Sequence, residues 1–264
     1  MLHSEAPDGL VVFYGDVMKM DFTRKDGIQT GYGNERCIMI SEGPNRKLGF
    51  GAFTYSTAAE LRALHQRLRQ AGVSLHESPC PVLADGFSVV DPDGNRLVFG
   101  VAPLPRGAVP ESPTARLQHL VVATDEMEPM LDFYADTLGF EISDRVVDED
   151  GDLRACFVHS DDEHHSFAFF KAPTKRLDHH SYECGEWNLI RDWADHMAGF
   201  DIPLKWGPGR HGPGNNLFFM VNDPDGNWVE LSAELETITP ERQPGMWPHT
   251  EKSLNLWGPG MLRS

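Results

Sequence analysis

Two imidazoles and one carboxylate in the second half of the chain could together bind a metal ion. Glu230 lies in an apolar Trp-Val-Glu-Leu strand and is expected to be buried, where a carboxylate needs a partner to offset its lost hydration. A divalent cation shared with His119 and His179 is one such partner, and an arginine is the other. Two imidazoles and a carboxylate suit Fe(II), Mn(II) or Zn(II). If they leave one face of the ion open, they favour oxygen chemistry at non-haem Fe(II).

The three candidate ligands are far apart in sequence, so the spacing alone is weak evidence for a metal. They can meet only if their strands converge in one curled sheet. The stretch from Gly207 to Leu231 supports such an arrangement, because a glycine-rich loop containing His211 precedes an aromatic strand, a DPDG turn and the Glu230 strand. A loop placed there is expected to form a wall of an active site.

An internal repeat predicts the scaffold that positions these residues. The motif Phe-Tyr-x-Asp at 13–16 returns at 133–136, and Asp-Pro-Asp-Gly-Asn at 91–95 returns at 223–227. The repeat divides the chain into a metal-free module at 1–105, a metal-binding module at 114–239 and a tail at 240–264. A proline-rich connector, Ala102 to Pro113, separates the two copies.

The ligand positions differ between the two copies. Phe50 stands in the first copy where the second has His179, and Val98 stands where it has Glu230. The counterpart of His119 would precede Met1, so the first strand of that copy is expected to be missing or replaced by the opening residues. A scaffold kept in both copies with ligands in only one suggests that the ligands serve chemistry.

Local patterns predict several elements. Thr57 and Glu60 form a capping box for a helix that carries leucines at helical spacing, and Asp125 with Glu128 offers a similar start in the second copy. Strands are expected at 117–122 and 165–169.

Composition indicates a soluble globular protein of 264 residues, 40% apolar and 24% charged. The formal net charge of −17 argues against nucleic-acid and anionic-membrane partners. No apolar run approaches the length of a membrane span and no signal peptide is evident, so a cytoplasmic location is expected. The four cysteines lack CxxC spacing and are expected to be free, buried thiols.

The chain resembles the two-module type I extradiol ring-cleaving dioxygenases of the vicinal oxygen chelate superfamily, such as catechol 2,3-dioxygenase and 2,3-dihydroxybiphenyl 1,2-dioxygenase. The resemblance covers most of the chain. The segments 117–121 and 177–183 are similar to the family's first two ligand strands, and the stretch from Gly209 through the DPDG turn to Glu230 is similar to its signature. The implied fold is α+β: two tandem modules of paired βαβββ units in curled mixed sheets, with the N-terminal module shortened.

The resemblance also implies the chemistry. His119, His179 and Glu230 would hold Fe(II), with Mn(II) as the alternative ion. The substrates would be a catechol and O2, the product a ring-opened acid, and the assembly a homo-oligomer. His165 would hydrogen-bond reduced oxygen, and His211 would act as acid or base.

The same resemblance places His165, His211, Asn215 and Met220 against the substrate. The family usually has a tyrosine at position 220, whereas the thioether of Met220 accepts hydrogen bonds weakly and cannot donate. Tyr182 is no obvious substitute, because its odd offset from His179 points it to the other face of the strand.

Two other functions stay open. One is a glyoxalase-like metal-dependent isomerase, which would draw further carboxylate ligands from the first module; Phe50 and Val98 argue against it. The other is a non-catalytic small-molecule-binding protein of the same fold, which Met220 keeps open.

Overall fold

A computed structural model describes residues 1–101 and 112–262 of the chain. The predicted connector, except for its last two residues, and the predicted boundary at residue 105 lie outside the described residues. No helix in the described part is long and apolar enough to cross a lipid bilayer. All four cysteines are free thiols, as predicted; three are buried, whereas Cys37 is only half-buried.

The first module forms two small sheets. Its elements are β1 (Leu2–Ser4), α1 (Pro7–Val12), the π-helix η1 (Phe13–Val17), β2 (Asp21–Lys25), β3 (Ile28–Gly33), β4 (Arg36–Glu42), β5 (Lys47–Leu48), β6 (Gly51–Tyr55), α2 (Ala58–Gln70), β7 (His76–Glu77), β8 (Ala84–Val90) and β9 (Arg96–Val101). The strand orders are β2-β3-β4-β1-β5 and β6-β9-β8-β7.

The second module and the tail build one larger sheet. Their elements are β10 (Arg116–Thr124), α3 (Met127–Leu131), η2 (Asp132–Thr137), β11 (Glu141–Val147), β12 (Leu153–His159), β13 (Phe167–Lys171), β14 (Arg176–Glu183), α4 (Trp187–Gly199), β15 (Trp206–Arg210), β16 (Leu217–Asn222), β17 (Trp228–Ala233), β18 (Gly245–Pro248) and α5 (Glu251–Leu254). The strand order is β15-β16-β17-β14-β10-β13-β12-β11-β18, so the tail strand β18 extends the edge beside β11. The structure thus confirms a mixed-sheet α+β fold.

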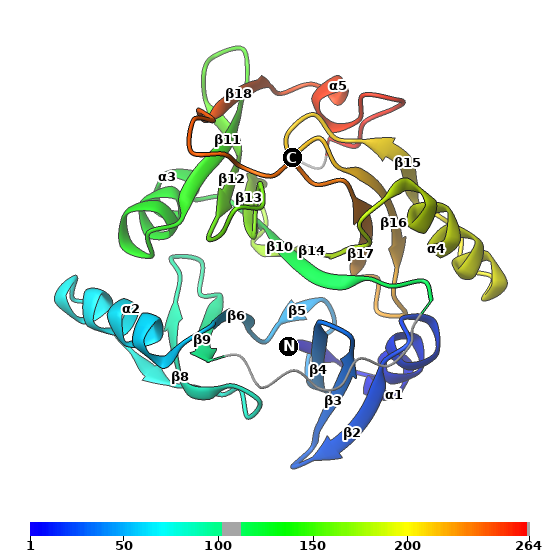
Figure 1. The fold of residues 1–264 in the computed structure, drawn as a ribbon, viewed down its shortest axis with the longest axis horizontal. Helices are drawn as coiled ribbons and strands as arrows, with labels where there is room; N and C mark the ends of the chain where they lie inside the picture. The colour runs from blue at the N-terminus through cyan, green and yellow to red at the C-terminus, as the bar shows by residue number, and fades with distance from the viewer. Residues whose placement is uncertain (102–111, 263–264) are drawn as a thin grey trace.

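Each half of the first module packs against one half of the second module (Figure 1). The α1 half of the first module lies against the α4 half of the second, and the α2 half lies against the α3 half. The repeated motifs join these halves: Tyr14 donates to Asp223 at 2.9 Å, and Tyr134 donates to Asp91 at 3.1 Å. Each bond ties the Phe-Tyr motif of one module to the DPDG turn of the other. A buried hydrogen bond to a charged group stabilises a fold by roughly 1.5–3 kcal/mol.

The predicted capping box of α2 is confirmed. Thr57 accepts from the amide of Glu60, while the Glu60 carboxylate accepts from the amide of Thr57. The second predicted start is wrong. The N-cap of α3 is Glu126 without a side-chain cap, because Asp125 instead pairs with Lys175 at 3.2 Å.

The shortened start of the first module is visible in its first strand. β1 has 3 residues, whereas β10, which carries His119, has 9. The positions that correspond to ligands are apolar: Phe50 and Val98 lie buried in one cluster with Met39 and Cys80. Phe50 and Val98 cannot bind a metal, which weakens the isomerase alternative.

Candidate metal centre

Neighbouring strands carry the three candidate ligands. His119 on β10 pairs with Ser181 on β14, and Ser181 pairs with Glu230 on β17. His179 lies two residues before Ser181 and so shares its face, because side chains alternate along a strand. Glu230 lies within β17, which runs on to Ala233.

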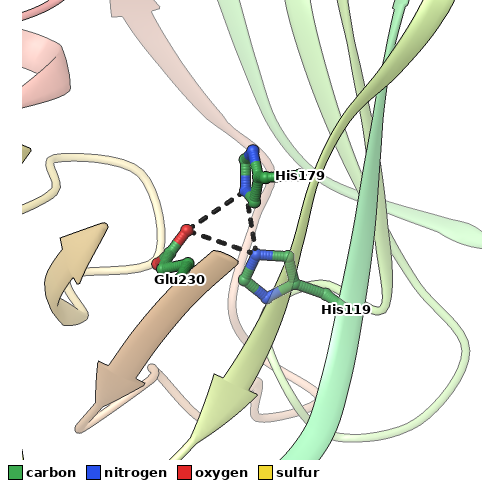
Figure 2. A group of neighbouring side chains, drawn as sticks. All are labelled: His119, His179 and Glu230. Atoms are coloured by element: carbon green, nitrogen blue, oxygen red, sulfur yellow. Dashed lines mark hydrogen bonds and ion pairs between the residues drawn. The ribbon is translucent and has the colours of Figure 1, made fainter. Parts of the chain in front are cut away.

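The three ligand atoms converge, as Figure 2 shows. Nε2 of His179 is 3.1 Å from Oε2 of Glu230, and Nε2 of His119 is 3.7 Å from the same oxygen. The two Nε2 atoms are 3.4 Å apart. Metal–ligand bonds of about 2.1 Å that meet near right angles place ligand atoms roughly 3 Å apart. One ion can therefore reach all three atoms, and the residues present fit a two-histidine, one-carboxylate metal site.

Neighbouring side chains turn each candidate ligand toward the point where the three ligand atoms converge. Nδ1 of His179 contacts Oδ1 of Asp178 at 2.7 Å, and Nδ1 of His119 contacts the side-chain oxygen of Gln118. Both acceptors place the imidazole proton on Nδ1 and leave the lone pair of Nε2 for a metal. Asn216 donates to Oε1 of Glu230 at 3.1 Å, which leaves Oε2 for the ion.

Burial and charge determine the ionisation of these groups. Burial by itself raises the pKa of Glu230, yet contacts from His119 and His179 hold it well below its usual range. Burial lowers the pKa of His119. For His179 burial acts in the same direction, but Asp178 and Glu230 together raise its pKa above 6.5. Glu230 is thus an ionised ligand among polar partners, and these are histidines and Asn216 rather than the arginine considered above.

His165 lies beside the ligands but just before the strand predicted to contain it, because β13 begins at Phe167. Its ring centroid is 4.3 Å from that of His119. Burial is the main reason that its pKa falls well below 6.5, and the charge of His119 adds to the effect. His165 is therefore neutral near pH 7.

His211 enters the site from the glycine-rich loop. Its ring stacks on Phe218 with centroids 3.7 Å apart, and Nε2 is 3.9 Å from Oε1 of Glu230. Nδ1 donates to the backbone carbonyl of Leu254, a residue of the tail. A carbonyl only accepts, so the proton of the neutral ring is on Nδ1.

A cavity of about 80 Å³ adjoins all five of these residues. Met220 is buried and lines it, directly across from Glu230 in the sheet. Asn215 does not line it: its side chain is exposed and its backbone is left-handed, with φ 52°. The buried neighbour Asn216 occupies the place expected for Asn215.

Comparisons with known proteins agree with this geometry. A family model described as the Glyoxalase/Bleomycin resistance protein/Dioxygenase superfamily matches residues 6–99 and 116–231. Metapyrocatechase 2 from Cupriavidus necator is 30% identical over 255 residues, covering 86% of this chain and 77% of that protein. The chain belongs to the two-module type I extradiol dioxygenase family.

Two further similarities show the breadth of the superfamily. An iron-dependent extradiol dioxygenase from Rhodococcus jostii (strain RHA1) is 26% identical over 245 residues, covering 84% of this chain and 80% of that protein. The Mn(II)-bound glyoxalase from Novosphingobium aromaticivorans superposes with a TM-score of 0.84 at 22% identity, covering 98% of this chain and 88% of that one. This second likeness concerns the fold.

Several residues of this extradiol-family site escaped the sequence interpretation. His164 and His180 were not among the candidate site residues, yet both are buried; His164 contacts Asp144, and His180 contacts Tyr14. Asp178 sits next to a ligand histidine, which was the available signal for its role. Leu254 binds His211 through its backbone carbonyl, a contact that no side-chain pattern in the sequence could signal. The expected orientation of Tyr182 is confirmed: it packs in the cluster between the modules.

Proposed function

We propose that this chain is an extradiol dioxygenase. It would bind a catechol at an Fe(II) ion held by His119, His179 and Glu230 and open the aromatic ring beside the diol with O2. The observation that carries the proposal is the convergence of three ligand atoms, with both histidines already oriented by acceptors at Nδ1. An ion held by only these three protein ligands would keep positions for the two oxygens of a diol and for O2.

When bound, Fe(II) would supply Lewis acidity and a redox-active centre for the reaction of the diol with O2. The chain's own residues orient the diol and move its protons. A catechol must lose at least one hydroxyl proton to chelate. In the neutral ring of His211 the proton on Nδ1 faces Leu254, so Nε2 can accept a diol proton and return it later.

The residues that line the cavity indicate which class of catechol it would bind. The walls include the apolar side chains of Val121, Phe157, Ala168, Trp206, Met220 and Leu254. Among the described lining residues there is no lysine or arginine. A carboxylated catechol would bury its charge there without a partner, at a cost of several kcal/mol. The proposed substrates are therefore catechols with hydrogen or small apolar substituents.

The test is oxygen consumption by the full chain loaded with Fe(II) under nitrogen. Catechol, 3-methylcatechol, 4-methylcatechol and 2,3-dihydroxybiphenyl are compared with the carboxylated 3,4-dihydroxyphenylacetate. We expect one O2 consumed per yellow ring-opened product with at least one uncharged catechol, and a lower kcat/KM for the carboxylated one. Mn(II) loading in parallel identifies which ion supports turnover.

A matched pair of carboxylates provides the control. Glu230→Gln should abolish turnover, whereas Glu234→Gln, at an exposed residue that pairs with Arg210, should not. Bound metal without oxygen uptake across the whole panel would refute the dioxygenase proposal and favour the isomerase. Failure to bind any metal would favour the non-catalytic binding protein.

A further inference from the structure

A buried carboxylate outside the metal centre binds the tail of the chain. Asp144 on β11 accepts hydrogen bonds from Arg242 at 2.7 Å, from the amide of Gly245 at 2.8 Å and from the indole of Trp247 at 2.8 Å. Its side chain is fully buried. Although burial raises the pKa of Asp144, the contacts from His164 and Arg242 lower it far below the usual range. Asp144 is thus an ionised acceptor held by three donors of the tail.

The same carboxylate faces His164. Oδ2 of Asp144 is 3.1 Å from Nε2 of His164, an ion-pair distance without ideal hydrogen-bond geometry. A carboxylate oxygen cannot donate, so the nitrogen that faces it carries the proton. His164 is fully buried. When the ring carries a single proton, that proton is therefore on Nε2, and Nδ1 keeps a lone pair.

The chain of contacts continues to the cavity. Nδ1 of His164 is 3.0 Å from Nδ1 of His165, and the two rings are nearly perpendicular, at 89°. If Nδ1 of His164 has the lone pair, Nδ1 of His165 must be the donor. The remaining nitrogen of His165, Nε2, then has a lone pair on the other side of a ring that lines the cavity.

The segment that leads into the tail holds the backbone of the loop that bears both histidines. The amide of His164 donates to the carbonyl of Glu236 at 2.8 Å, and the amide of Ile238 donates to Asp162 at 2.7 Å. Glu236 in turn binds Arg242 through two hydrogen bonds of 3.1 and 3.0 Å. Residues 236–247 therefore hold both the backbone at His164 and the Asp144 carboxylate that faces the His164 ring.

We propose that Asp144 and His164 are positioning residues. Held by the tail residues 242–247, they keep the His165 ring in one orientation, with its proton on Nδ1 and the lone pair of Nε2 toward the cavity. His165 then begins the reaction as a hydrogen-bond acceptor, in contrast to the donor role expected from the family resemblance. The importance of this state for turnover rests on the proposed function, but the proton position does not.

The experiment is nitrogen NMR of the full chain labelled with 15N-histidine and prepared without metal. In a neutral imidazole the protonated and the unprotonated nitrogen have widely separated chemical shifts, so the spectrum shows which nitrogen carries the proton. The signals of His165 are assigned by their loss in His165→Gln. We expect the wild-type His165 to be protonated on Nδ1. A proton found on Nε2 in the wild type overturns the proposal without any further variant.

Two variants then test the chain of contacts. His164→Phe removes the acceptor and should move the His165 proton toward Nε2. Gly245→Ala removes no side chain, yet it should also move the His165 proton toward Nε2, because a Cβ at residue 245 would overlap the Asp144 carboxylate. His196→Gln is the control: His196 is a partly buried histidine that contacts the backbone carbonyl of Val17, and its loss should leave the His165 signals unchanged.

Kinetics of the Fe(II)-loaded variants complete the test. We expect kcat to fall roughly 10- to 100-fold for His164→Phe, as for other buried partners that orient a functional imidazole, with KM for the catechol changed by less than about threefold. Unchanged His165 signals or an unchanged kcat in His164→Phe would overturn the proposal. Expected NMR results in a chain that cleaves no catechol would instead refute the proposed function and leave the positioning intact.

Discussion

Replacing Asp178 by asparagine should weaken metal binding without removing a ligand. Asp178 is buried, with 4% of its surface exposed, and its Oδ1 lies 2.7 Å from Nδ1 of His179. The asparagine oxygen can still accept this proton, so the orientation of the ring should survive and only the negative charge is lost. A hydrogen bond to a charged partner contributes about 1.5–3 kcal/mol, against about 0.5–1.5 for a neutral one.

The difference of about 1–1.5 kcal/mol corresponds to roughly a tenfold lower affinity for the metal. This lies at the lower end of the 10- to 100-fold loss typical of such partners. The affinity can be measured by competition with a coloured chelator, using Zn(II) as an air-stable probe and Fe(II) under nitrogen. Asp192→Asn is the control, because Asp192 is exposed and pairs with Arg191.

An affinity within twofold of the wild type would contradict the view that Asp178 tunes His179. A loss beyond a thousandfold would also contradict the reasoning, because it would mean that the asparagine had displaced the ring. Circular dichroism would show whether the fold had changed.

The other predictions concern a ligand, the cavity and the module interface. His179→Ala should lose stoichiometric iron while the fold persists, with exposed His76→Ala as the control; iron retained at one equivalent would refute the assignment. Met220→Tyr should change kcat or KM, because position 220 lines the cavity, and unchanged kinetics would mean that it does not face the substrate. Burial lowers the pKa of His180 to about 3. Between pH 6.5 and 3 the unfolded chain therefore binds a proton that the folded chain does not. The free energy of unfolding should fall as the pH falls through this window. The free energy of unfolding, measured with denaturant at several pH values, should depend less steeply on pH in His180→Gln than in the wild type. An equal pH dependence in the two proteins would mean that His180 does not cause it.

The low pKa of His180 has a local cause that illustrates the role of packing. Tyr14 donates to Asp223, so Nε2 of His180 must donate to the tyrosine oxygen at 3.0 Å. Nδ1 is buried without a hydrogen-bond partner, so a second proton would have nothing to bind. These groups come from three distant segments, and no pattern along the chain connects them.

The sequence by itself determined the features that follow from local chemistry and from the repeat. These include the capping box at Thr57, the α+β two-module fold and the candidate ligands His119, His179 and Glu230, which the structure brings together. The capping box depends on residue type and short spacing, whereas the fold and the ligands were indicated by the internal repeat and by the family resemblance, which compare whole segments of the chain. A homo-oligomeric assembly and a cytoplasmic location stay predictions of the sequence.

Only the tertiary structure decided which groups surround the metal ligands. It places Asn216 rather than Asn215 at the cavity, buries His164 against Asp144, and brings the carbonyl of Leu254 to His211. The physical reason is that a hydrogen-bond partner is chosen by how the sheet curls and where the tail crosses it. A shift of one residue turns a side chain to the other face, and that choice depends on contacts between segments far apart in the sequence.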